Sequence, residues 1–225
     1  MDRRHFAALA LSGLTAAARP ALAAKPPAEW DGLVKVKAKT FELVYLRPGA
    51  DFRGYTKVIL DPTEVAFQRT WKRDYNSSSA SSSMQVTDRD IQRMADEGRK
   101  SAAEILQKAY AAGGYPVVSD PAADVLRVRT ALIDITVSAP DTNSPGITRT
   151  YSRDAGEATL VVEARDSMTG ALLGRAVDSR TIDDFTMEWR NRVTNRQDFS
   201  RQVESWAKNS VKTLDELKAL SPIAG

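Results

Sequence analysis

The sequence contains no cysteine, and its only histidine is His5, near the N-terminus. Such a chain cannot be stabilised by disulfide bonds or by zinc bound to thiolates and imidazoles, so its stability has to come from a hydrophobic core. Its 225 residues, 42% of them hydrophobic, are enough to build one. We therefore expect a single globular domain.

The same two shortages restrict the chemistry. Ser-His-Asp and Cys-His nucleophilic mechanisms both need a histidine, and the part of the chain after His5 contains neither histidine nor cysteine. These mechanisms are therefore excluded for that part of the chain. The sequence has no phosphate-binding P-loop, no dinucleotide-binding glycine motif and no calcium-binding loop. We expect no cofactor, no metal and no enzymatic activity, although carboxylates, lysines and hydroxyl groups remain available for catalysis.

Residues 1–23 have the pattern of a cleavable signal peptide. Arg3 and Arg4 precede a mildly apolar run at 6–18, and Ala21 and Ala23 form an A-x-A cleavage signal. The run is shorter than the roughly 20 residues that span a bilayer. The arginine pair favours twin-arginine export, with the general secretory route as the alternative. We expect a periplasmic protein without a transmembrane segment, and not a lipoprotein, because no cysteine is available for acylation.

Charge argues against a nucleic-acid partner. The net charge is +3, but Arg3, Arg4 and Arg19 against Asp2 contribute +2 of it, so the remaining chain is almost neutral. Arg127 and Arg129 alternate along one expected strand and are predicted to lie on a solvated face.

Hydrophobic periodicity predicts an α+β fold. Helices are expected from a Thr87 cap to Gly113 and from a cap at Thr194 or Asn195 onward. Extended segments are expected at 33–46, 57–60, 115–119, 125–137, 156–167 and 171–182, with a break at Pro62 and a bulge near 132–135. These elements predict a mostly antiparallel sheet of about five to six strands, packed on one face by two main helices. The expected organisation is signal peptide 1–23, linker 24–32, one domain 33–220 and tail 221–225.

Arginines cluster before the last predicted helix. Arg190, Asn191, Arg192 and Arg196 lie where free backbone N–H groups and the helix dipole favour anions, and arginine adds bidentate recognition. The segment therefore predicts a site for an anionic cell-wall polymer or an envelope protein. The alternative is an ordinary polar helix start.

A second candidate is an aromatic and cationic interaction surface around the first turn, made of Tyr45, Arg47, Tyr55 and Trp71. The alternative is that these side chains close the end of a sheet. Two clusters of acidic residues are expected to be solvated rather than catalytic. One contains Asp183, Asp184 and Glu188, and the other contains Asp61 and Glu64.

Several segments together resemble an uncharacterised bacterial family, domain of unknown function 3313. They are YLRPGADFRGY at 45–55, KVILDP at 57–62, VTDRD at 86–90, VLRVR at 125–129, GEATL at 156–160, DSMTG at 166–170 and VTN at 193–195. The resemblance covers about residues 32–220. It implies an exported envelope protein, in a family with many lipoproteins, and a fold like small periplasmic domains such as the N-terminal domain of TolB. It implies no catalytic residue.

The sequence thus favours a non-catalytic binding domain of the cell envelope. One alternative is a carboxylate-dependent enzyme acting on cell-wall glycan, which needs two carboxylates about 5–9.5 Å apart in one cleft. The other is a small-molecule carrier, which needs an enclosed apolar pocket of a few hundred Å³.

Overall fold

The computed structural model describes residues 26–79, 85–138, 150–190 and 192–224, with side chains placed for all of these except 150–154, 183–190 and 192–195. The predicted signal peptide, including Arg3, Arg4, Ala21 and Ala23, lies outside the described residues. The elements are β1 (Glu29–Trp30), β2 (Leu33–Val36), β3 (Leu43–Leu46), β4 (Lys57–Leu60), β5 (Glu64–Phe67), α1 (Trp71–Ser78), α2 (Asp88–Ala112), β6 (Val125–Val137), β7 (Thr150–Asp166), β8 (Leu172–Arg190) and α3 (Arg192–Leu220).

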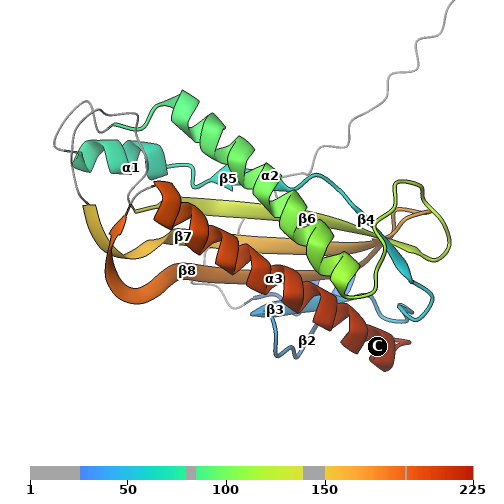
Figure 1. The fold of residues 1–225 in the computed structure, drawn as a ribbon. Coiled ribbons are helices and arrows are strands. Elements are labelled where there is room, and N and C mark those ends of the chain that lie inside the picture. Colours follow the sequence, from blue (N-terminus) through green and yellow to red (C-terminus); the bar gives the residue numbers. More distant parts are fainter. Residues whose placement is uncertain (1–25, 80–84, 139–149, 191, 225) are drawn as a thin grey trace, which may run out of the picture.

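One eight-stranded sheet in the order β1-β2-β3-β8-β7-β6-β4, with β5 also paired to β6, forms the body of the protein. Two helices, α2 and α3, lie side by side across one face of this sheet and run in the same direction (Figure 1). The predicted α+β class and the covering of one face by two helices are confirmed. Of the helices in the described part of the chain, none combines the length and hydropathy needed to cross a bilayer.

The sheet has more strands than the expected five to six, and two of the additional strands come from predicted segments that are divided. The extended segment at 33–46 folds back on itself, so that Val34 pairs with Leu46 and one predicted strand becomes β2 and β3. The break at Pro62 separates β4 from β5, and both pair parallel with successive parts of β6. The sheet is therefore mixed at one edge. The short β1 and helix α1 were not predicted, and the predicted strand at 115–119 forms only an isolated bridge between Val117 and Val58.

Strand β6 in the middle of the sheet matches its prediction closely. Strand β6 spans Val125–Val137, and its register shifts between Ile133 and Thr136, where Asp134 has a φ of 54°. The shift keeps apolar side chains facing the helices on both sides of the bulge. Helix α2 begins at the predicted cap, because Thr87 and Asp90 form a reciprocal capping box. Helix α3 begins at Arg192, two or three residues before the expected cap at Thr194 or Asn195.

Asp178 ties helix α3 to the sheet. Its carboxylate is 1% exposed and accepts hydrogen bonds from the indole Nε1 of Trp206 at 2.8 Å and from the backbone N–H of Glu42 at 3.0 Å. The Nε of Arg180 donates a third bond at 2.8 Å. One buried carboxylate thus joins β8, the segment before β3 and the middle of α3.

Candidate functional site

A cavity of about 140 Å³ opens between the N-terminal halves of α2 and α3, above the edge of the sheet formed by β5 and β6. Its lining is mostly apolar. The side chains that enclose it come from all four elements: Val65 and Phe67 of β5, Leu132, Ile135 and Val137 of β6, Met94 and Ala102 of α2, and Phe199 and Val203 of α3. We call this space the α2–α3 cavity.

The cavity exists because the two helices pack closely only in their C-terminal halves. There Leu106, Tyr110, Trp206 and Ala207 are almost fully buried. Helix α2 ends at Gly113, where an added Cβ would overlap with the side chain of Val211 on α3. Toward the N-termini the corresponding residues, Met94, Phe199 and Val203, are only partly buried. The space between the helices is therefore unfilled at that end.

Gly98 lies in the cavity wall, in the interior of α2. An added Cβ would meet only the methyl carbons of Val65, at 3.6 and 3.8 Å, which are ordinary contact distances. Neither a left-handed conformation nor close packing therefore requires glycine here. Since glycine inside a helix costs about 1 kcal/mol relative to alanine, its structural consequence is to leave the cavity wider.

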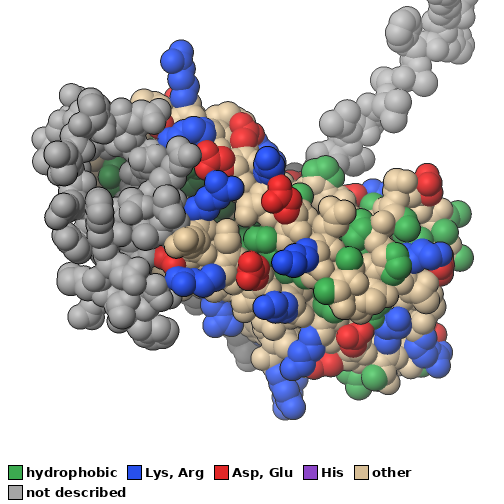
Figure 2. All heavy atoms as spheres, viewed as in Figure 1, with side chains coloured by type: hydrophobic (Ala, Val, Ile, Leu, Met, Phe, Trp, Pro, Cys, Tyr) green, Lys and Arg blue, Asp and Glu red, His purple; other side chains and the backbone are tan. Residues whose placement is uncertain are grey.

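Charged side chains stand at the rim of the cavity. Arg93 and Glu97 come from adjacent turns of α2, and Arg196 comes from α3. Arg93 is ion-paired with Asp90 at 3.2 Å, whereas Arg196 is exposed. Over the rest of the helix-covered face, positive and negative side chains are interspersed (Figure 2). The rim thus combines two guanidinium groups and one carboxylate beside an apolar interior.

The predicted anion site is only partly described. Asn191 lies outside the described residues, and so do the side chains of Arg190 and Arg192, whose backbones end β8 and begin α3. The side chain of Arg196 is placed, at the cavity rim. Of this cluster, Arg196 is therefore the residue that the structure connects with a possible site.

The three aromatic residues of the predicted surface, Tyr45, Tyr55 and Trp71, are buried. Tyr45 is fully buried against Trp30 and donates a hydrogen bond to the carbonyl of Pro27. Trp71 is buried against Phe67. Tyr55 is 8% exposed and donates to Asp166 at 2.8 Å.

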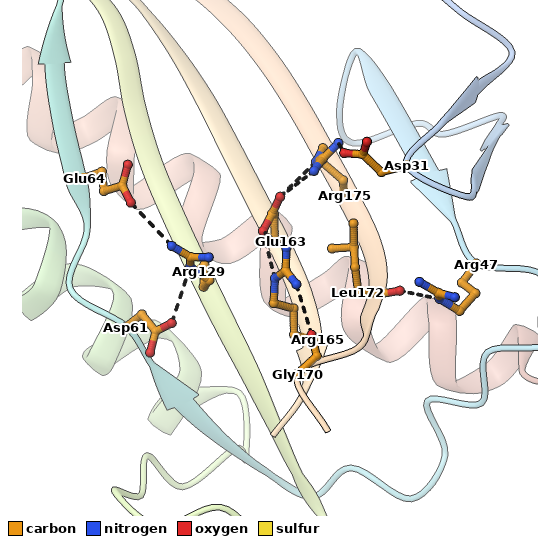
Figure 3. Close-up of polar contacts among 10 residues, drawn as sticks. All are labelled: Asp31, Arg47, Asp61, Glu64, Arg129, Glu163, Arg165, Gly170, Leu172 and Arg175. Atoms are coloured by element: carbon orange, nitrogen blue, oxygen red, sulfur yellow. Dashed lines mark hydrogen bonds and ion pairs between the residues drawn. The ribbon is translucent and has the colours of Figure 1, made fainter. Parts of the chain in front are cut away.

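Burial and the Asp166 carboxylate both raise the pKa of Tyr55. Arg47 donates through Nε to the carbonyl of Leu172 (Figure 3). The expectation of one shared exposed surface is therefore corrected, because the three rings serve as core residues, which is the alternative that the sequence left open.

The face of the sheet opposite the helices carries an ion-pair network (Figure 3). Glu163 binds Arg175 at 2.7 Å and Arg165 at 2.8 Å, and Arg175 also binds Asp31 at 2.8 Å. Trp30 stacks over the same guanidinium, 4.2 Å from its ring centroid. Burial would raise the pKa of Glu163, but the hydrogen bonds from Arg175 and Arg165 outweigh it and hold that pKa below its ordinary value.

A second, separate group of ion pairs corrects the expectation of a solvated arginine face. Arg127 binds Asp61 at 2.7 Å, and Arg129 lies 3.6 Å from both Asp61 and Glu64. Arg127 and Arg129 keep only about a third of their side chains exposed. These pairs link the β4–β5 edge to β6, which is a structural role.

The remaining carboxylate cluster is not described: the side chains of Asp183, Asp184 and Glu188 lie outside the residues with placed side chains. Within the part of the chain that the structure describes, no three acidic side chains come together as a metal site would require. The α2–α3 cavity was not predicted. Its only signal in the sequence was the pair of small residues, Gly98 and Ala102, within the apolar stripe of α2.

A comparison with known families identifies a match over most of the chain. The family model described as "Protein of unknown function (DUF3313)" matches residues 26–210. No curated protein matches the chain.

Solved structures give several similar folds at low sequence identity. One is the PelC dodecamer from Paraburkholderia phytofirmans, 15% identical, with 76% of this chain and 95% of that chain covered and a TM-score of 0.39. Protein XCC0632 from Xanthomonas campestris, of family DUF330, is 9% identical, with 77% and 91% covered and a TM-score of 0.41. A minor lipoprotein from Acinetobacter baumannii is 11% identical, with 72% and 94% covered and a TM-score of 0.29.

Proposed function

The chain belongs to the DUF3313 family of proteins of unknown function, and we propose that it acts as a non-catalytic binding domain of the cell envelope. In this proposal it is exported to the periplasm and holds an apolar group of its ligand in the α2–α3 cavity. The observation that carries the proposal is the apolar lining of that cavity, together with its opening at a charged rim.

An apolar cavity of this size can bind without chemistry. An engineered cavity of about 150 Å³, lined by aliphatic and aromatic side chains, stays dry and takes up benzene. The α2–α3 cavity, at about 140 Å³, is close to that size. Burial of a hydrocarbon group there would stabilise a complex by the hydrophobic effect. Among the described residues that line the cavity, Glu97 is the one carboxylate, and acid–base catalysis by a carboxylate pair needs two.

The two alternatives have less support. A glycan-cleaving enzyme would need a free pair of carboxylates, whereas Asp61 and Glu64 both lie 3.6 Å from the guanidinium of Arg129. A carrier would enclose a whole small molecule in a few hundred Å³. The smaller α2–α3 cavity fits one group of a larger ligand, with the remainder outside.

Export rests on the pattern of residues 1–23. Replacing Arg3 and Arg4 together by lysine is expected to keep the protein in the cytoplasm, because the twin-arginine route requires the pair. Fractionation and N-terminal sequencing of the full-length protein would measure this. Normal export of the double variant would overturn the twin-arginine route, and a mature protein that begins at Met1 would overturn cleavage.

Binding at the cavity can be tested by site-specific photocrosslinking in cells. A photoreactive residue in place of Glu97, at the rim, is expected to crosslink an envelope component, and Gly98→Leu in the same protein should lower the yield at least five-fold. The matched control places the same residue at Ser179, on the opposite face of the sheet. Equal yields from the two positions, or a yield that Gly98→Leu leaves unchanged, would refute the proposed site.

A further inference from the structure

The charges at the rim suggest which ligand the α2–α3 cavity would take. Arg196 makes no ion pair with the residues that the structure describes, although it lines the cavity. Arg93, on the facing helix, places a second guanidinium at the same rim, next to one carboxylate, Glu97. Arginine binds carboxylates through two parallel hydrogen bonds, so an exposed arginine beside an apolar cavity suits an anionic head group.

The interior of the cavity defines the other end of the ligand. Its walls include Val65, Val203 and the flexible side chain of Met94, which adapts to chains of different shape. Gly98 leaves open the space that a larger side chain would fill. By comparison with the benzene-binding cavity, the available volume corresponds to about six carbon atoms.

We infer that the α2–α3 cavity binds a single-chain alkyl carboxylate, with the last six or so carbons of the chain between α2 and α3 and the carboxylate on Arg196. This inference rests on the proposed function of the cavity and specifies its ligand. The competing occupants are an apolar side chain of a partner protein, a second copy of this chain and an uncharged hydrocarbon. Measurements with carboxylates and an alcohol separate these from an alkyl carboxylate.

The experiment is a chain-length series of straight-chain carboxylates from butanoate to decanoate, each below its micelle concentration. Calorimetry measures the affinity for the mature protein, and methyl NMR resonances of Met94, Val65 and Val203 locate the site. Each added methylene should tighten binding about four-fold until the cavity is full, after which the affinity should level off. A series with no plateau, or resonance shifts confined to other parts of the protein, would overturn the inference.

Variants test the two ends of the ligand separately. Arg196→Gln should weaken octanoate about five-fold and leave octan-1-ol unchanged, because only the carboxylate pairs with the guanidinium. Lys208→Gln, farther along α3, is the matched charge control and should change neither affinity by more than two-fold. Octanoate and octan-1-ol of equal affinity for the unmodified protein would overturn the role of Arg196.

Gly98 tests the alkyl end. Gly98→Leu should abolish binding of both octanoate and octan-1-ol. Gly98→Ala should move the plateau about one carbon earlier, and it serves as the readout if the leucine variant does not fold. An unchanged plateau in Gly98→Ala would place the chain elsewhere. If crosslinking depends on Gly98 but no carboxylate binds, this inference is overturned and the proposed function stands. If crosslinking does not depend on Gly98 and no carboxylate binds, the inference and the proposed function are both overturned.

Discussion

The buried carboxylate of Asp178 allows a prediction whose magnitude follows from its contacts. Asp178→Ala removes the acceptor for the buried indole N–H of Trp206 and for the partly buried backbone N–H of Glu42. Each buried donor left without a partner costs about 1–3 kcal/mol. The third donor, Arg180, is 53% exposed and can be rehydrated at little cost.

The indole of Trp206 accounts for most of the cost, because water can reach the N–H of Glu42, so the expected loss in the free energy of unfolding for Asp178→Ala is about 3 kcal/mol. Asp178→Asn keeps the shape but turns an amide donor toward one of the two N–H groups, so its loss should be about 2 kcal/mol. Urea unfolding followed by far-ultraviolet circular dichroism measures both, and it is unaffected when an indole is removed. The control Asp96→Ala, which breaks the exposed ion pair with Arg99 on α2, should cost less than about 1 kcal/mol.

A double-mutant cycle tests the reasoning further. Because Trp206 and Asp178 interact directly, the losses for Trp206→Phe and Asp178→Ala should not add, and the double variant should be more stable than their sum by about 1 kcal/mol or more. A loss below about 1 kcal/mol for Asp178→Ala, or strict additivity in the cycle, would refute the assignment of Asp178 as the anchor of α3.

Three further predictions concern stability. The folded state holds the pKa of Glu163 below its ordinary value of 4.5, so Glu163→Gln should destabilise the protein most above pH 4.5. The difference in the free energy of unfolding between the variant and the unmodified protein should shrink as the pH falls below 4.5, and a difference that is independent of pH between 7 and 3 would contradict this. Gly156→Ala should cost about 3 kcal/mol or more in urea unfolding, since Gly156 has a φ of 140° and an added Cβ would overlap with the carbonyl of Thr136; an unchanged midpoint would contradict the geometry. Gly98→Ala should raise the free energy of unfolding by about 1 kcal/mol, and a decrease would show that glycine is needed there for packing.

Features of the fold set by neighbours in sequence were predictable. The capping box of Thr87 and Asp90 fixes the start of α2, and a change in the phase of apolar residues near Leu132 marks the bulge of β6. Both signals depend on a few consecutive residues. Backbone hydrogen bonds and side-chain alternation translate them directly into structure.

Features set by partners distant in sequence were not predictable in this way. The split of residues 33–46 into two strands depends on Val34 finding Leu46, and the parallel pairing of β4 depends on Val125, which lies after the whole of α2. Arg127 and Arg129 have the pattern of a solvated face, yet the β4–β5 edge brings Asp61 and Glu64 against them. Periodicity specifies which face of a strand is apolar, but not which charges will lie opposite it.

The α2–α3 cavity was not predictable for the same reason, because it depends on contacts between residues distant in sequence, including those of Asp178. The apolar stripes predicted which side of each helix faces the sheet, but the gap between two helices depends on side-chain size on both. In the C-terminal halves, Trp206 with Asp178 and the contact of Gly113 with Val211 hold α3 close to α2 and the sheet. Because these contacts hold the C-terminal halves together, Gly98 can leave the N-terminal halves apart without loss of the fold. Filling that space should therefore stabilise the protein and impair binding in the same variant, a combination that a purely structural cavity would not produce.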